Sequence, residues 1–210
     1  MLTNGMTMAE VRSVIHTDMT EIFKFLKNRE NNYRRTVLKS SKFPLYFEPY
    51  HFTSSGKNEW ILIIEASDKK AIQYEKSKIT SILLMNTKVG YYVYMPTLVM
   101  GKFHIVVFPP HFFSRYRERM NMNYYGKKLI TEYFIRNSSF VFDHKSTIYD
   151  NIKIIEVAAS TNDGVGLGYV LLEGDTFLKT FITYEMLKGE QIEKYTENEK
   201  IRKEIHDKFF

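Results

Sequence analysis

The chain has 210 residues, contains no cysteine and carries a formal net charge of +6. Its length suits one domain with a substantial core and does not require two. The lack of cysteine excludes disulfides, thiolate metal sites and cysteine nucleophiles, and it is typical of a reducing compartment, so we expect a cytoplasmic protein. The modest positive charge permits a phosphate-rich partner without demanding one.

Neither a secretory signal nor a membrane span is expected from the sequence. Residues 1–12 lack a basic segment followed by an apolar run. The longest apolar runs, at residues 61–64 and 105–113, are far shorter than the roughly 20 residues that cross a bilayer. We therefore expect a soluble protein without a membrane partner.

The N-terminal segment has a helical pattern. Apolar residues recur at steps of three and four over residues 8–39, and no proline interrupts them, which predicts one or two helices. The end of this segment is basic, and Arg34, Arg35 and Lys39 are candidates for a nucleic-acid-binding face. A solvated helix face explains the same charges, so both interpretations stay open.

The segment that follows consists of short runs with the residue pattern of β-strands. Strands are predicted at residues 45–52, 60–65, 79–85, 90–95 and 103–108. Short turns connect them rather than helix-length crossovers, which favours an antiparallel sheet. Residues 96–102 are expected to form a loop, and they provide the one candidate boundary inside the chain.

A helix pair follows, because Pro109 and Pro110 end the last strand and suit the first turn of a helix. Helices are predicted at residues 111–120 and 125–136. Three more strands, at residues 152–159, 168–172 and 177–184, form a meander through turns at residues 162–164 and 173–175. Glycines 164, 166 and 168 have the spacing of a dinucleotide loop, but their place between two strands favours a hairpin with glycines at crowded positions.

These elements predict an α+β protein with an N-terminal helix, an antiparallel β-sheet, a central helix pair and a C-terminal three-strand meander. We expect a single domain over residues 1–210. It can be subdivided into a helix and sheet at residues 1–100, a helix-helix-sheet unit at residues 101–187, and a charged tail helix at residues 188–210.

The strongest candidate site lies on the first helix of the pair. His111, Arg115 and Arg119 are four residues apart and therefore share one helix face. An imidazole can move a proton near neutral pH, and guanidinium groups stabilise phosphate oxygens, so this set suits phosphodiester chemistry. Arg117 of the same helix is a further candidate for nucleic-acid binding. The structural alternative is that His111 caps the helix and the arginines pair with Glu118, Asp143 or Glu156.

Other chemistry has little support in the sequence. No pair of histidines has the spacing of a metal site, and no phosphate-binding loop occurs, so neither a metal nor a cofactor is expected. The 15 tyrosines and 16 phenylalanines could stack on bases. Because many of them fall in strand patterns, core packing is the simpler explanation.

Three segments carry a family resemblance: residues 108–119, with the pattern His111-x-x-x-Arg115-x-x-x-Arg119, and residues 168–172 and 178–184. The order of these segments resembles the order found in the small ribonuclease toxins of the BrnT and RelE-like superfamily. Those toxins have a barnase-like fold, in which a helix packs on an antiparallel sheet. The resemblance implies metal-independent RNA cleavage in which the ribose 2′-hydroxyl attacks the adjacent phosphate.

In this resemblance, His111 transfers the proton and Arg115 and Arg119 hold the charged transition state. Thr180 or Thr183 contacts phosphate, and a protein neutraliser or regulator is an implied partner. The first hundred residues have no counterpart in the family. The alternative functions are a non-catalytic module of phage or mobile-element origin that binds nucleic acid or protein, and a small-molecule module that uses the aromatic N-terminal sheet.

Overall fold

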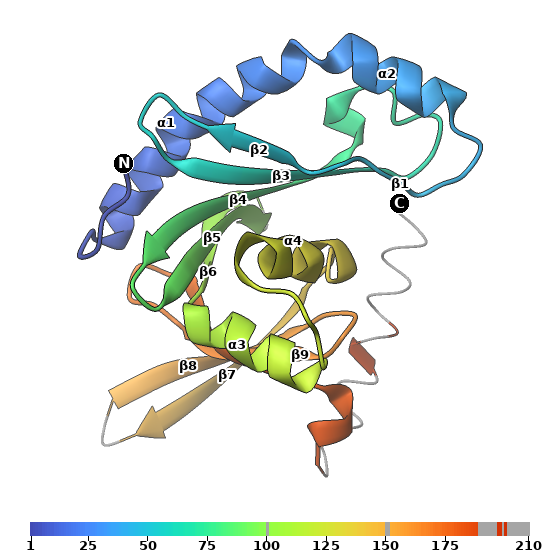
Figure 1. Ribbon diagram of the computed structural model, residues 1–210. Coiled ribbons are helices and arrows are strands. Elements are labelled where there is room, and N and C mark those ends of the chain that lie inside the picture. Colours follow the sequence, from blue (N-terminus) through green and yellow to red (C-terminus); the bar gives the residue numbers. More distant parts are fainter. Residues whose placement is uncertain (100, 150–151, 189–196, 199, 201–210) are drawn as a thin grey trace. The chain divides into compact units, whose positions relative to one another are not determined.

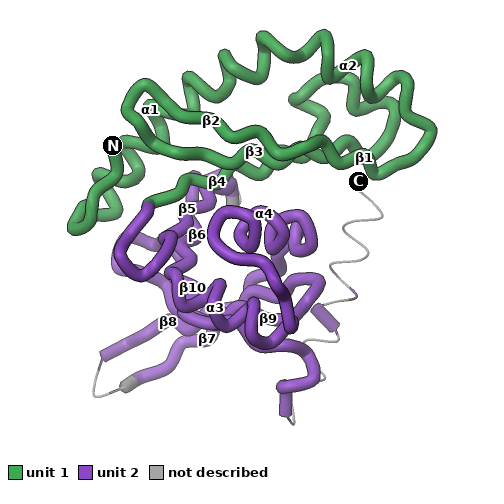
Figure 2. Tube along the Cα trace, in the orientation of Figure 1, with its two compact units in different colours: residues 1–85 green, residues 86–210 purple. Residues whose placement is uncertain are grey.

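The computed structural model describes residues 1–99, 101–149, 152–188, 197–198 and 200. Its described part contains four α-helices and ten strands, which confirms the predicted α+β class. The chain forms two compact units, Met1–Met85 and Asn86–Phe210, shown in green and purple in Figure 2. None of the helices in the described ranges has the length and apolar character needed to cross a membrane.

Two helices begin the first unit, α1 (Met8–Lys27) and α2 (Glu30–Lys39). Thr7 caps α1, because its side chain accepts from the backbone N–H of Glu10 while the Glu10 carboxylate accepts from the N–H of Thr7. One face of α1 is buried and includes Val11, Ile15, Ile22 and Leu26. The helical prediction for this segment is confirmed.

The strands of the first unit are arranged around β3 (Glu59–Ala66). Strand β4 (Lys78–Thr87) pairs along one edge of β3, and β1 (Leu45–Tyr46) and β2 (Tyr50–Thr53) pair along the other, all antiparallel. Helices α1 and α2 lie on one side of these strands (Figure 1). The buried Asp18 of α1 accepts hydrogen bonds of 2.8 Å from Asn58 and from Trp60, which fastens this helix to the start of β3.

The described part of the second unit contains six strands in the order β5-β6-β10-β9-β8-β7. Neighbouring strands are antiparallel except β6 and β10, which run parallel. Strand β10, the last of these six in chain order, therefore lies inside the sheet, between β6 and β9. The bounds are β5 Gly90–Val99, β6 Lys102–Phe108, β7 Val141–Tyr149, β8 Ile152–Ser160, β9 Val165–Val170 and β10 Thr176–Ile182.

Helices α3 (Pro110–Arg119) and α4 (Gly126–Arg136) build an aromatic core with this sheet. The ring of Phe108, at the end of β6, is fully buried. It lies 5.1–6.0 Å between centroids from the rings of Phe112, Phe113, Tyr133 and Phe134. Edge-on and tilted contacts between aromatic rings stabilise a core by more than the burial of apolar surface area alone.

Two sequence predictions about strands are wrong. The expected loop at residues 96–102 is strand through Val99, with Pro96 opposite Ile105 in the β5–β6 pair; proline fixes φ in a range that extended backbone tolerates. The C-terminal meander has four strands rather than three, because β7 precedes the three strands that the sequence predicts. Residues 143–147 of β7 are all polar, so the sequence shows no alternation of apolar and polar residues there. The strand nevertheless pairs with β8 along its whole length.

The predicted glycine hairpin is confirmed, since β8 and β9 are antiparallel and glycines 166 and 168 lie within β9. Strand β9 also begins three residues before the expected position. The chain divides at Met85, whereas the sequence suggested a boundary near residue 100. Of the predicted tail helix at residues 188–210, all but residues 188, 197, 198 and 200 lie outside the described residues.

Candidate nucleic-acid interface

The exposed side of α3 carries a short hydrogen-bonded series of side chains. Arg115 Nε donates to His111 Nε2 at 3.4 Å, and Arg115 Nη1 donates to Glu118 Oε2 at 2.8 Å. The side chains of Arg115 and Glu118 are 41% and 63% exposed, so their ion pair adds little to stability. The structure thus brings together two of the predicted site residues and also forms one of the ion pairs that the structural alternative expected.

The other predicted catalytic residues lie apart from this series. Arg119 ends α3, and its Nη1 atom is buried without a hydrogen-bond partner in the described ranges. Thr180 precedes Phe181, whose ring packs against Tyr116 of α3 at 5.0 Å. Because neighbours on a strand point to opposite faces, Thr180 lies on the face of the sheet away from α3. Thr183 follows β10 and begins the short 3₁₀ helix at Tyr184–Met186.

A carboxylate in the β8–β9 turn accepts hydrogen bonds from α3 and from the end of α4. Asp163 Oδ2 accepts from Tyr116 Oη at 2.6 Å, from Arg136 Nε at 2.8 Å and from Asn137 Nδ2 at 3.0 Å. Its Oδ1 accepts from Arg136 Nη2 at 2.7 Å. This arrangement joins the end of α4 and the middle of α3 to one turn.

The environment of this carboxylate changes two pKa values. Burial alone raises the pKa of Asp163, but the hydrogen bonds from Arg136, Tyr116 and Asn137 outweigh it, and the net pKa is lowered. Burial raises the pKa of Tyr116, and its hydrogen bond to Asp163 raises that pKa further. Near neutral pH the pair is therefore a phenol that donates to a carboxylate.

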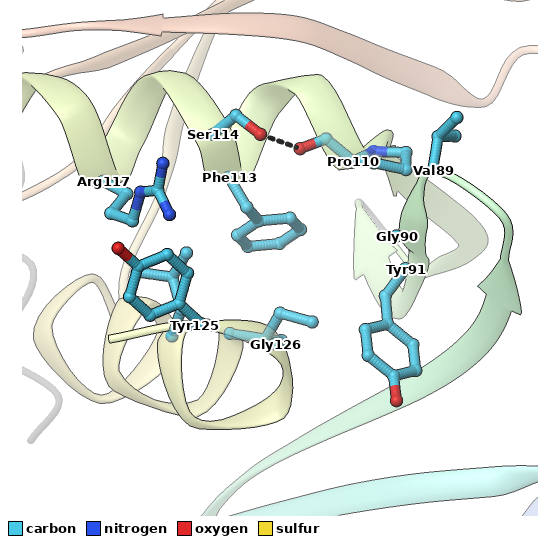
Figure 3. Close-up of a pocket in the computed structure, with 11 residues that line it drawn as sticks. Val89, Gly90, Tyr91, Pro110, Phe113, Ser114, Arg117, Tyr125 and Gly126 are labelled. Carbon is cyan, nitrogen blue, oxygen red and sulfur yellow. Dashed lines mark hydrogen bonds between the residues drawn. The ribbon is translucent and has the colours of Figure 1, made fainter. Parts of the chain in front are cut away.

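A pocket opens where α3, α4 and the start of β5 meet, and its volume is about 180 Å3. Figure 3 shows the Phe113 ring pointing into it, with Arg117 and Tyr125 on one side and Tyr91 on the other. Arg117 is the one charged residue among those that line the pocket. The full lining consists of Val89, Gly90, Tyr91, Pro110, Phe113, Ser114, Arg117, Tyr125, Gly126, Leu129 and Ile130.

The end of α3 has a local geometry that shapes this pocket. Asn121 has a left-handed φ of 49°, its N–H donates to Glu118 O, and the N–H of Met122 donates to Arg117 O. These two bonds and the left-handed residue are a Schellman motif, in which asparagine is one of the favoured residues. The motif turns the chain back and leads it toward Tyr125.

Two glycines complete the pocket. Gly126 has a φ of +55°, which a residue with a side chain rarely adopts, and it starts α4 directly after Tyr125. Gly90 has a φ of +121°, and a Cβ on it would lie 3.2 Å from the Pro110 side chain. Glycine therefore allows the start of β5 to approach the start of α3.

Three tyrosines each have a cation over the ring, and two of them, Tyr91 and Tyr125, line the pocket. The Arg117 guanidinium lies 4.3 Å from the Tyr125 ring centroid, Lys128 Nζ lies 4.5 Å from that of Tyr124, and Lys127 Nζ lies 5.9 Å from that of Tyr91. All three distances fall within the range of cation–π attraction. We call these six residues the tyrosine–cation cluster: Tyr91, Tyr124, Tyr125, Arg117, Lys127 and Lys128.

Arg117 is the one residue of this cluster that the sequence predicts as a binding residue. The signal in the sequence is the adjacency of aromatic and basic residues in the run Tyr124-Tyr125-Gly126-Lys127-Lys128. The other predicted nucleic-acid-binding residues, Arg34, Arg35 and Lys39, are exposed on α2 of the first unit.

Among the described residues, no group of three His, Asp or Glu side chains has an arrangement that could hold a metal ion. Compared with known proteins, the chain matches no protein-family model, no curated protein and no solved structure.

Proposed function

We propose that this protein binds single-stranded RNA through the tyrosine–cation cluster. The observation that carries the proposal is a set of three cation–ring pairs, from which Tyr91, Tyr125 and Arg117 line one open pocket. Proteins that bind single strands combine aromatic rings, on which bases stack, with cations that attract the phosphates. Both features adjoin here on α3, α4 and β5.

Exposure of the cluster supports this function. Tyr125 is 69% exposed, which places it among the most exposed large hydrophobic residues of the described chain. Arg117 covers one face of its ring, so the opposite face is the candidate for stacking with a base. An acidic protein would use the cations but would gain less from three tyrosine rings.

The test is a binding titration of a fluorescently labelled 12-nucleotide RNA followed by anisotropy. A variant with Arg117→Gln, Lys127→Gln and Lys128→Gln is expected to bind at least about tenfold more weakly, because each lost phosphate contact removes counterion release. The matched control removes three exposed lysines elsewhere in the same unit: Lys145→Gln, Lys153→Gln and Lys179→Gln.

Equal loss of affinity in the two triple variants would show that only net charge matters and would contradict the proposed interface. Absence of RNA binding by the wild-type protein at low salt would reject the function itself. If an acidic peptide binds as tightly as the RNA 12-mer, the result would favour the alternative that the protein binds another protein.

A second candidate function is metal-independent RNA cleavage, and the contact between His111 and Arg115 on an exposed helix supports it. The resemblance to ribonuclease toxins gives the roles: His111 would transfer the proton, Arg115 and Arg119 would stabilise the phosphate charge, and the 2′-hydroxyl would attack. A protein that neutralises or regulates this activity would be a further partner.

This candidate is tested by RNA degradation in EDTA. The wild-type protein is expected to cleave, and His111→Ala and Arg115→Ala are each expected to be at least about 100-fold slower. Equal cleavage by all three proteins, or cleavage by none, would reject the catalytic role.

A further inference from the structure

We infer that the pocket between β5, α3 and α4 holds one unstacked nucleobase of a bound single strand. This inference rests on the proposed RNA binding and adds the class of ligand that the pocket itself takes. It concerns the hollow lined by Phe113 and Leu129, whereas the cations of the cluster serve the phosphates around it.

The floor of the pocket is apolar. Phe113, Leu129 and Ile130 line it and are only 4%, 5% and 2% exposed. Small-molecule sites have this character, with apolar walls and a few polar groups that set orientation. A planar aromatic ligand would bury its faces against these side chains and the Tyr125 ring.

A phosphate fits this pocket less well than a base. Ser114 is the one hydroxyl-bearing side chain among the non-aromatic lining residues, and its Oγ already donates to Pro110 O at 3.2 Å. Arg117 is therefore the main donor that an anion would find inside. An anion needs several donors once it leaves water, but a base needs an apolar, aromatic wall and one polar group at its rim.

Two nearby lysines favour a nucleotide that belongs to a strand over a free nucleotide. Lys127 and Lys128 follow Tyr125 on α4 and lie over the rings of Tyr91 and Tyr124. A base in the pocket would thus leave its own and adjacent phosphates near two further cations. A base inside a duplex would first have to leave its stack, which costs free energy, so single strands are favoured.

The test fills the pocket without touching the cations. Ser114 is exposed on α3 and lines the pocket, so Ser114→Phe places a ring in the space of the base. The matched control is Ser13→Phe, the same change at an exposed position of α1 in the first unit. We expect Ser114→Phe to weaken binding of the single-stranded 12-mer at least about fivefold, the lower end for one lost base stack, and Ser13→Phe to leave it unchanged.

A second pair of variants keeps the inference testable if Ser114→Phe fails to fold. Tyr125→Ala is expected to lose at least about fivefold in affinity, and Tyr125→Phe, which keeps the ring, is expected to retain it. The fully paired duplex of the same sequence should bind the wild type more weakly than the single strand. A free nucleoside monophosphate should fail to displace the 12-mer at concentrations where the unlabelled strand displaces it.

The outcomes separate the two proposals. If wild type binds the strand and the triple cation variant does not, but Ser114→Phe and Tyr125→Ala bind normally, RNA binding stands and the base pocket is rejected. If duplex and single strand bind equally, the unstacked base is likewise rejected. Displacement by the free monophosphate at the same concentration as the strand would overturn the claim that the ligand belongs to a strand.

Discussion

The phenol of Tyr116 donates a 2.6 Å hydrogen bond to Asp163, 47 residues later in the chain. The same carboxylate accepts two hydrogen bonds from Arg136, at the end of α4. One side chain in the β8–β9 turn therefore holds both helices that carry the tyrosine–cation cluster. The position of the candidate interface depends on a contact that lies outside it.

Replacing this carboxylate should destabilise the second unit. Asp163→Asn keeps the size of the side chain but removes the charge that Arg136 and Tyr116 face, and hydrogen bonds to charged groups contribute about 1.5–3 kcal/mol. We expect the free energy of unfolding in urea to fall by that amount. Glu173→Gln is the matched control, since Glu173 is exposed in the β9–β10 turn, and its effect should stay within about 0.5 kcal/mol.

The contribution of Asp163 should also depend on pH. Its pKa is lower in the folded chain than in the unfolded chain, so folding is favoured where the carboxylate is ionised. The stability difference between wild type and Asp163→Asn should therefore be complete above about pH 5 and should shrink as the pH falls through about 4 and below. Urea unfolding at pH 7, 5, 4 and 3 measures it, and a difference that grows on acidification would contradict the assigned charge.

The single substitution Arg117→Gln should change the salt dependence of RNA binding. Each phosphate contact on a single strand contributes about 0.7 to the slope of log K against log salt concentration. We expect the slope for Arg117→Gln to be smaller by about that amount than the wild-type slope. Lys179→Gln removes the same charge on β10 and should leave the slope unaltered; a parallel change in both variants would argue against a contact at Arg117.

Two glycines of β9 should tolerate alanine very differently. A Cβ on Gly168 would lie 1.8 Å from the carbonyl oxygen of Phe177, so the backbone itself would have to move. A Cβ on Gly166 would approach the Leu178 side chain at 3.1 Å, and that side chain can shift. Gly168→Ala should cost more than about 3 kcal/mol of folding free energy, and Gly166→Ala no more than about 2. Thermal unfolding of the two variants gives the comparison, and equal costs would mean that the strand adjusts at both positions.

The helices were predictable because their signals are local. The signals are the periodic apolar residues of α1 and the prolines before α3, and each acts within a few residues of its helix. Strand β7 was not predictable in this way, because its polar residues form a strand only through pairing with β8. Likewise, β9 consists partly of glycines whose role depends on the approach of Phe177.

The candidate site was predictable only in part. Helical spacing placed His111 and Arg115 on one face of α3, and the structure joins them by a hydrogen bond. The pocket depends on the left-handed Asn121 and on Gly126, which leave no periodic pattern in the sequence. The side chains that donate to Asp163 are 26, 27 and 47 residues away, so no local sequence pattern predicts these contacts.

The place of β10 inside its sheet has a consequence for synthesis on the ribosome. The strand pairs with both β6 and β9, although it is the last of the six to leave the exit tunnel. Until Thr176–Ile182 emerges, β6 lacks its parallel neighbour, and the aromatic face of α3 lacks Phe181. Nascent chains that stop before β10 would expose unpaired backbone and apolar rings, as incomplete sheets generally do. The sheet of the second unit therefore cannot be completed before β10 has been made.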